Sequence, residues 1–194
     1  MSNAITQQDY DVIVLGGGSA GYAAARMTAA AGLRTVVIES GEEVGGLCIL
    51  RCCMPTKALL YAAEVMHLAS HAEPWGIRVE KVGFDFAKVM ERKNTLIKDF
   101  ADYRREQLAS GNFKFIRAHA QFLDPHTVAL SNAGPSPRRS DYGHAGGPLT
   151  AAHFVITTVS TVAPPPLPEL REIGYLASDD ALKLTQLPKS LAVL

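Results

Sequence analysis

The sequence lacks an excess of charge of either sign, a long apolar run and a wide spread of cysteines. Its 19 basic and 19 acidic residues give a formal net charge of zero, so composition does not indicate nucleic acid or an anionic membrane as a partner. No apolar run reaches about 18 residues, which by run length excludes a membrane-spanning helix. With 194 residues, 47% of them hydrophobic, the chain is expected to form one globular domain with a buried core and no membrane contact.

The N-terminus lacks the order of a secretion signal, in which basic residues precede an apolar stretch. Residues 1–9 form a polar tail, in which Ser2-Asn3-Ala4 is either a vector scar or native sequence. A cytoplasmic location is therefore the default expectation. The sequence also contains no internal repeat.

The chain has only three cysteines, Cys48, Cys52 and Cys53, and they fall within six positions. A secreted disulphide framework spreads its cysteines along the chain, so this clustering indicates a site. Metal binding is the least favoured interpretation, because no C-x-x-C pairs with a second cluster and no histidine lies at ligand spacing; no metal is predicted. A redox pair is favoured, and buried, inert thiols are the alternative.

Spacing alone leaves open which two cysteines would pair. Cys48 and Cys52 share a helical face, whereas Cys48 and Cys53 lie about 140° apart around an ideal helix and need a local distortion to form a disulphide. Adjacent Cys52 and Cys53 would close a strained ring. In each case a helix N-terminus beside Lys57 is expected to lower the pKa of a thiol and favour its thiolate.

A glycine-rich turn follows the first apolar segment. Tyr10–Leu15 is short and rich in β-branched residues, which predicts a strand buried on both faces. Gly16, Gly18 and Gly21 then fit the pattern G-x-G-x-x-G. In this pattern the first glycine allows a tight turn, the second lets the backbone approach a pyrophosphate, and the third lets the next helix pack closely.

The next helix and strand complete a βαβ unit. The helix opens at Ser19 and Ala20 and ends before Gly32, so its free N–H groups and positive dipole end would face the phosphates. The strand over residues 34–38 ends on Glu39, which lies where an acceptor for ribose hydroxyls is expected, about 20 residues beyond the motif. The unit predicts dinucleotide binding; the alternative is an ordinary βαβ turn with incidental glycines.

The rest of the chain continues the α/β pattern. One helix is expected to start at the cysteines, with Pro55 at its first turn, and to continue over residues 57–70; a second is expected over 84–110. The strands expected from the hydrophobic pattern are residues 113–116, a hairpin of 118–123 and 127–130, a buried strand 154–158, and the start of another at 191–194. Residues 132–148 are expected to form a mobile loop, and residues 162–168, with four prolines, an extended segment.

The residues around the cysteines carry a family resemblance. Gly45-Gly46-x-Cys48-x4-Cys53-x-Pro55-Thr56-Lys57, behind the first glycine unit, closely resembles the FAD-dependent pyridine nucleotide–disulphide oxidoreductases, which include dihydrolipoamide dehydrogenase, glutathione reductase and mercuric reductase. The resemblance implies an α/β, Rossmann-like FAD-binding domain, with a parallel sheet flanked by helices and a small antiparallel β-meander. It also implies that Cys48 and Cys53 form the redox-active disulphide, with Cys48 exchanging with substrate and Cys53 facing the flavin.

Other positions are expected to contact the cofactor on the same grounds. Lys57 would lie near the reactive edge of the flavin, and Arg117-Ala118-His119-Ala120 resembles the family's strand that lays backbone against adenine. The segment 157–160 resembles its Ala-Thr-Gly-Ser segment, with Thr158 matching the threonine. The cofactor contacts that the motifs and the resemblance imply are Gly16, Gly18, Ser19, Ala20, Gly21, Glu39, Gly45, Gly46, Lys57, His119, Ala120 and Thr158.

Three residues depart from the family pattern. Leu47 stands where the family usually has threonine, and Cys52 and Val159 stand where it has glycine. Cys52 is a competing thiol at helical spacing from Cys48, and we expect Cys48 to pair with Cys53 nonetheless. Val159 places a β-branched side chain where a glycine conformation is expected.

The family's complete enzymes continue with an NAD(P)H domain, which has its own glycine motif, and a dimerisation domain with a catalytic His–Glu pair. This sequence has one such motif. The chain is therefore expected to consist of a polar tail (1–9), the first segment of an FAD-binding domain (10–190) and the start of a truncated NAD(P)-binding domain (191–194). The implied activity passes electrons from NAD(P)H through FAD to a small disulphide, dithiol or metal-ion substrate, in a cytoplasmic homodimer that serves cell redox homeostasis. The chain alone is expected to lack turnover; the alternatives are a flavoprotein with non-catalytic cysteines and a non-enzymatic FAD-binding or interaction fragment.

Overall fold

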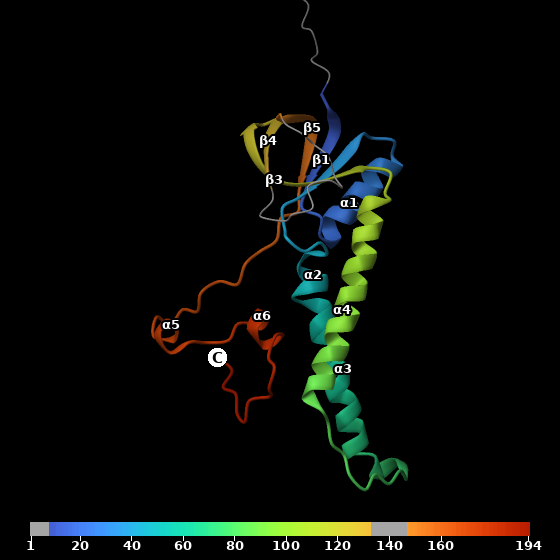
Figure 1. Cartoon of the computed structure of the whole chain (residues 1–194), viewed down its shortest axis with the longest axis vertical. Coiled ribbons are helices and arrows are strands. Elements are labelled where there is room, and N and C mark those ends of the chain that lie inside the picture. The colour runs from blue at the N-terminus through green and yellow to red at the C-terminus, as the bar shows by residue number, and fades with distance from the viewer. Residues whose placement is uncertain (1–7, 133–146) are drawn as a thin grey trace, which may run out of the picture. The chain divides into compact units, whose positions relative to one another are not determined.

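The computed structural model describes residues 8–132 and 147–194 (Figure 1). Most of the expected polar tail and of the expected loop over 132–148 therefore lies outside the described residues. The chain divides into two compact units, Met1–Gly46 with Ala101–Ser160 and Leu47–Phe100 with Thr161–Leu194. Each unit is described by itself below.

Five strands of the first unit form one closed, mixed sheet (Figure 1). They are β1 (Tyr10–Leu15), β2 (Thr35–Glu39), β3 (Lys114–Asp124), β4 (Thr127–Asn132) and β5 (Leu149–Ile156). β1 lies between β2 and β5, β2 pairs with β3, and all three pairings are parallel. β4 runs antiparallel to both β3 and β5 and so closes the sheet.

This closure corrects the expectation of a parallel sheet with a separate small meander. The segments expected as a strand over 113–116 and a hairpin strand over 118–123 are one continuous strand, β3. Its first part pairs with β2 as far as Arg117, and from Ala118 onward it pairs with β4. β5 likewise begins at Leu149, earlier than the expected 154, so its start pairs with β4 and the rest with β1. Because β3 and β5 each pair with a parallel strand along one part and with β4 along the other, they connect the parallel and antiparallel parts of the sheet.

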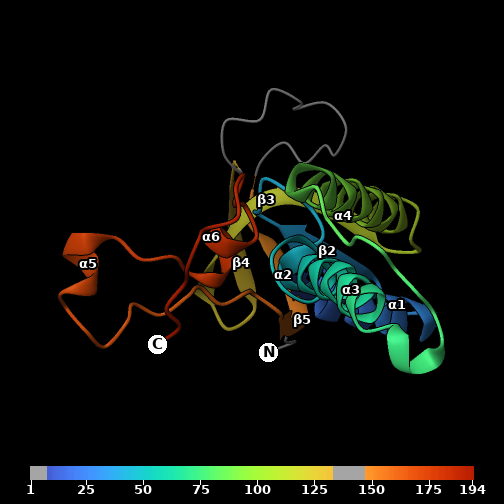
Figure 2. The same cartoon turned by 90° about the horizontal axis from the view of Figure 1, so that it is seen from below.

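Alternate residues of the strands face two separate apolar cores. On β1, Ile13 and Leu15 point into the closed sheet, where they pack with Val36 and residues of the other strands. Val12 and Val14 face the opposite way, toward helix α1 (Ser19–Ala30), which lies against β2 (Figure 2). Because both faces are covered, the central strands are apolar throughout, as expected for parallel strands buried on both sides.

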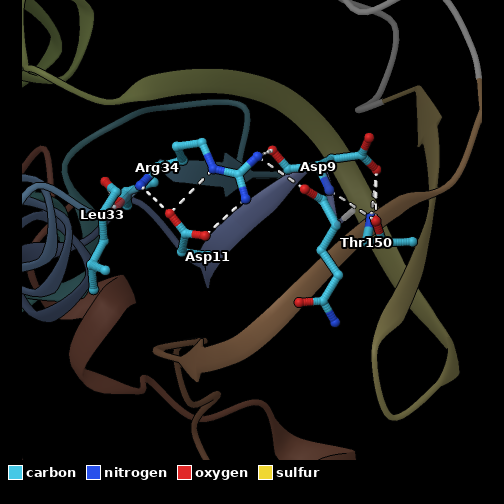
Figure 3. A network of polar contacts seen from close by, with 7 residues as sticks. Asp9, Asp11, Leu33, Arg34 and Thr150 are labelled. Atoms are coloured by element: carbon cyan, nitrogen blue, oxygen red, sulfur yellow. Dashed lines mark hydrogen bonds and ion pairs between the residues drawn. The ribbon is translucent and has the colours of Figure 1, made fainter. Parts of the chain in front are cut away.

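A polar network fixes the start of β1 to the strands beside it (Figure 3). Arg34 donates from Nη2 to Asp11 Oδ1 at 2.8 Å and from its backbone N to Asp11 Oδ2 at 2.7 Å. Its hydrogen bonds lower the pKa of the Asp11 carboxyl. On the β5 side, Asp9 Oδ2 accepts from Thr150 N at 2.9 Å. Since these groups are exposed, the network defines the strand register more than it stabilises the fold.

The second unit is built from helices. α2 (Gly46–Leu50) leads into it, and it contains α3 (Cys53–Ser70), the 3-10 turn η1 (Glu73–Trp75), the first part of α4 (Phe86–Ala109), α5 (Leu170–Ile173) and α6 (Ser178–Ala181). The helix expected to start at the cysteines and to continue to about residue 70 is α3, and the expected helix over 84–110 matches α4 within two residues. The expected strand at 191–194 was wrong: these residues form no strand in the described chain and are exposed, because no described strand lies beside them to pair with.

Two polar contacts join distant segments of this unit. Arg51 Nη1 donates to Asp179 Oδ2 at 3.2 Å, which links the residues after α2 to α6. Lys93 of α4 is 6% exposed and donates from Nζ to the backbone oxygen of Leu182 at 2.5 Å. Burial lowers the pKa of the Lys93 ammonium. The C-terminal segment is thus held by the cysteine region and by α4.

One stretch, Gly46–Ser70, is long and apolar enough to cross a membrane by length and composition alone. By this criterion, the expectation that the chain contains no segment able to form a membrane-spanning helix was wrong. The helical stretch is interrupted at Arg51 and Cys52, and only 11% of its most apolar window is buried. Exposed apolar side chains on α3 include Leu60, Tyr61 and Leu68. A single such stretch is weak evidence of a membrane span.

Candidate functional site

Two of the three motif glycines are required by the fold itself. Gly16 has a φ of +108°, and a Cβ there would lie 2.6 Å from the backbone oxygen of Thr157. A Cβ on Gly21 would lie 1.8 Å from the backbone oxygen of Gly16. These positions therefore allow the sharp turn after β1 and the close packing of α1 on that turn, as the sequence pattern predicts.

Gly18 is different, because the protein leaves space beside it. A Cβ there would meet only the Cα of Gly46, at an ordinary contact distance of 3.5 Å. Gly46 itself has a φ of +71°, and its own Cβ would come within 2.6 Å of Gly18 Cα. At Gly18 the backbone is thus approached only by a second glycine, which suits a ligand that needs close contact with main-chain N–H groups.

The N-terminus of α1 offers such N–H groups. Among the described residues no side chain caps this helix end, and its first turn, which begins at Ser19 and Ala20, holds no acidic residue. The first N–H groups of a helix have no acceptor within the helix, and its dipole makes that end positive. The turn and the helix end therefore fit a pyrophosphate.

Glu39 lies at the end of β2, beside the same turn. Its Oε2 accepts from Gly17 N at 2.7 Å, and its Oε1 accepts from Gly41 N at 2.6 Å. A carboxylate has about four acceptor positions, so these two hydrogen bonds orient Glu39 and leave capacity for ribose hydroxyls. This geometry suits the role predicted for it.

Arg117 and Thr157 are two positioning residues that the sequence reasoning missed. Arg117 pairs in register with Glu39, and its Nη2 donates to the backbone oxygens of Gly41 and Glu42. The hydroxyl of Thr157 donates to the backbone oxygens of Leu15, at 2.9 Å, and Gly16, at 3.0 Å. Both residues hold loops beside the glycine turn. The available signal was their place at the carboxyl ends of parallel strands, where ligands bind in α/β sheets.

The remaining predicted contacts of this unit lie on β3, in the segment after β5 and just before α2. His119 is exposed on β3, opposite Ser131, and Ala120 is half-buried against the inner core. Thr158 is exposed, one residue beyond Thr157. In the described part of the chain no residue other than glycine has a positive φ, so Val159 does not need the glycine conformation that the family pattern suggested. Gly45, with a φ of +149°, precedes Gly46.

The three cysteines lie at the break between α2 and α3, in the second unit. α2 ends at Leu50 and α3 begins at Cys53, and Cys52 has a non-helical backbone with φ −141° and ψ −98°. Cys48 is half-buried, Cys52 and Cys53 are exposed, and all three are free thiols. The break is the local distortion that a contact between Cys48 and Cys53 requires.

Among the three cysteines only Cys53 has a lowered pKa. A hydrogen bond from Cys48 lowers the pKa of the Cys53 thiol, and a hydrogen bond from Cys52 and the charge of Lys57 lower it further. The same bonds raise the pKa of Cys48 and of Cys52, and burial adds to the rise for Cys48. Cys53 is also the first residue of an 18-residue helix, whose positive end favours a thiolate. Of the three cysteines, Cys53 is therefore the one that loses its proton most easily.

Within residues 8–132 and 147–194, no group of three or more His, Cys, Asp or Glu residues is arranged to hold a metal ion. The structure thus presents two groups of predicted site residues. The first unit brings together the glycine turn, Glu39 and the start of α1, and the second brings together the cysteines and Lys57.

Comparison with known proteins gives one consistent result. The model of the family described as pyridine nucleotide-disulphide oxidoreductase matches residues 10–194. A dihydrolipoyl dehydrogenase of Bacillus subtilis is 34% identical over 95% of this chain and 39% of its own length. A mercuric reductase of Bacillus cereus is 30% identical over 96% of this chain and 27% of its own length.

A solved structure agrees with these relatives. The HOCl-induced flavoprotein disulfide reductase RclA from Escherichia coli is 26% identical, with a TM-score of 0.67, over 92% of this chain and 35% of that chain. The chain therefore spans between 27% and 39% of the length of the relatives it matches.

Proposed function

Because this chain belongs to the pyridine nucleotide–disulphide oxidoreductases, a family that uses FAD and NAD(P)H, we propose that it is the FAD-binding segment of such an enzyme. Electrons would pass from NAD(P)H through FAD to a disulphide of Cys48 and Cys53, and from there to the substrate. The observation that carries the proposal is the family match over residues 10–194, together with the break between α2 and α3. The two cysteines that the family motif selects stand on the two helices that flank this break.

FAD, when bound, would supply the two-electron carrier between the nicotinamide and the thiols. Gly18 and the N–H groups that begin α1 would hold its pyrophosphate, because the turn has room for close approach there. Glu39 would accept hydrogen bonds from the ribose. The other residues proposed to contact the cofactor are Gly16, Gly21, Gly45, Gly46, Lys57, His119, Ala120 and Thr158.

The thiols would carry out the exchange with substrate. In the reduced pair, Cys48 gives its proton to solvent and attacks a substrate disulphide, forming a mixed disulphide and releasing one substrate thiolate, which takes up a proton. The Cys53 thiolate then attacks Cys48 Sγ, breaking the mixed disulphide and releasing the second thiolate. The substrate is reduced by two electrons, and the chain is left with a Cys48–Cys53 disulphide. The lowered pKa of Cys53 favours the second step, because more of it is thiolate.

We propose a small disulphide or dithiol, or a metal ion, as the substrate class, since the relatives are named dihydrolipoyl dehydrogenase and mercuric reductase. A reducing, cytoplasmic location is proposed with it, because free thiols at a site persist where disulphides are kept reduced. We further propose a homodimer without membrane contact, in which residues 191–194 begin an NAD(P)-binding domain. These last points follow the family pattern.

The chain alone is proposed to bind FAD weakly and to lack NAD(P)H-dependent turnover, because its sequence has one glycine motif and no candidate for a second. The test adds NADH or NADPH and a disulphide acceptor to the FAD-reconstituted chain. We expect a flavin absorbance spectrum and no nucleotide oxidation above the free-flavin background. Saturable turnover would contradict the proposal that the nicotinamide site lies elsewhere, and a chain with no flavin spectrum would contradict FAD binding.

A further inference from the structure

Two histidines stack on each other at the carboxyl end of α3. His67 and His71 are both exposed, and their ring centroids lie 4.2 Å apart with an angle of 30° between the ring planes. His71 follows the last residue of α3, and its backbone N donates to His67 O at 3.0 Å, which continues the helical hydrogen-bond pattern. Side chains four residues apart lie on one helical face. This spacing lets two imidazoles bind one ion, as in helical zinc sites.

The backbone fixes the His71 ring in the form that a metal ion requires. Its Nδ1 lies 2.9 Å from the backbone oxygen of His67, and because a carbonyl oxygen only accepts, Nδ1 carries the proton and donates it. The neutral ring therefore has its free lone pair on Nε2. Histidines that bind metals in proteins commonly donate their other ring N–H to a backbone carbonyl in this way. This hydrogen bond points to a cation ligand independently of the spacing.

The separation of the two rings is close to what a shared ion needs. Two nitrogens bound at about 2.0–2.1 Å to one tetrahedral ion are about 3.3 Å apart. That distance is roughly 1 Å shorter than the 4.2 Å between the ring centroids. The nitrogens stand at the ring edges, and the last torsion of a histidine side chain is broad. Small rotations of these two exposed side chains therefore bring one nitrogen of each ring to the required separation.

The charges at this end of the helix favour a cation. The carboxyl end of a helix is the negative end of its dipole, and α3 has 18 residues. Glu64 precedes His67 by three residues, so it adds a negative charge on the same helical face. In the described part of the chain no third His, Cys, Asp or Glu completes a group that could hold a metal ion. Water would therefore fill the other coordination positions.

We propose that His67 and His71 bind one divalent transition-metal ion of the kind that imidazole prefers, such as Zn²⁺, Ni²⁺ or Cu²⁺. The ion clamps the last turn of α3, just before the chain enters η1. Because a two-histidine chelate exists only where the helix end is folded, the ion stabilises the folded chain by mass action. The inference does not depend on the proposed redox use of the cysteines.

The test titrates Zn²⁺ into the full 194-residue chain by isothermal titration calorimetry. The thiols are first blocked with N-ethylmaleimide, because thiolates would compete for the ion. One ion should bind per chain. His67→Gln and His71→Gln should each weaken the binding at least about tenfold, since a single imidazole remains. The matched control His153→Gln, which removes an exposed histidine of β5, should bind Zn²⁺ as the wild-type chain does.

A further variant keeps the number of histidines and moves one of them. Val65 is 49% exposed, and His67→Gln/Val65→His places the two histidines six residues apart, about 120° around the helix. This variant should bind Zn²⁺ as weakly as His67→Gln does. Zn²⁺ should also raise the Tm of the wild-type chain and leave the Tm of the moved variant unchanged. Far-ultraviolet circular dichroism checks that each variant is folded.

Failure of the wild-type chain to bind Zn²⁺ would overturn the proposal. Wild-type affinity in His71→Gln or in the moved variant would overturn it as well, because the ion would then be held elsewhere. Since the thiols are blocked in every titration, none of these outcomes bears on the proposed Cys48–Cys53 pair.

Discussion

Alanine at Gly21 and alanine at Gly18 are expected to damage the protein in different ways. A Cβ on Gly21 would lie 1.8 Å from Gly16 O, whereas carbon contacts are ordinarily about 3.5 Å or longer. The start of α1 and the turn after β1 must therefore separate by roughly 1.7 Å, the difference between these distances. Overpacking of this kind costs about 3 kcal/mol of unfolding free energy, which lowers Tm by roughly 6–12 °C in a chain of this size.

Gly18→Ala introduces no such overlap, since its Cβ would meet only Gly46 Cα at 3.5 Å. Alanine is a poorer N-cap than glycine, so we expect a loss of at most about 1 kcal/mol, or roughly 4 °C in Tm. The added methyl group would instead stand where a pyrophosphate approaches the backbone. FAD affinity should therefore fall at least about tenfold, and Gly18→Val should abolish it.

The assay pairs thermal unfolding, followed by circular dichroism, with FAD titration of each variant. Gly21→Ala should show a large fall in Tm, and Gly18→Ala should show a near-normal Tm with weakened flavin binding. Equal destabilisation by the two variants would refute the inference that space beside Gly18 is left for a ligand. Normal FAD affinity in Gly18→Val would refute the location of the pyrophosphate.

Four further predictions concern the cysteines and Val159. Non-reducing peptide mapping of the oxidised wild-type chain should find Cys48 bridged mainly to Cys53, because the Cys53 thiolate is the better nucleophile at neutral pH; a dominant Cys48–Cys52 bridge would contradict this pairing. The pKa of Cys53, measured from the pH dependence of its alkylation, should rise more in Cys48→Ala than in Lys57→Met, because the hydrogen bond from Cys48 is the largest cause of the lowering. Since the folded pKa of Cys53 is lowered, its contribution to stability is present above the unfolded pKa and is lost as pH falls through the folded value, so Cys48→Ala should weaken the pH dependence of Tm in that window. Val159→Gly should not raise Tm, because Val159 has no positive φ to relieve; a clear increase would show backbone strain there.

Features that depend on residues close together in the chain could be predicted from the amino-acid sequence. The first βαβ unit, its glycine turn and Glu39 were predictable, because strand periodicity, glycine spacing and the acid that follows all lie within Tyr10–Glu39. The spacing of Cys48 and Cys53, with the residues up to Lys57, was enough to indicate the family, which the match over residues 10–194 confirms. The helix that starts at the cysteines was predicted as well, because Pro55 marks its first turn and apolar residues recur along it.

The pairing of segments that are far apart in the sequence could be seen only in the three-dimensional structure. The closure of the sheet depends on β4 pairing with both β3 and β5, and short-range patterns do not reveal pairings between segments far apart in sequence. For the same reason Arg117 and Thr157, which hold the loops beside the glycine turn, could not be distinguished from their neighbours. Which of the three cysteines has a lowered pKa could also not be predicted from the sequence. Spacing placed Cys52 closer to Cys48, whereas the structure has a helix break at Cys52 and a lowered pKa at Cys53, because a pKa depends on the positions of neighbouring groups in space.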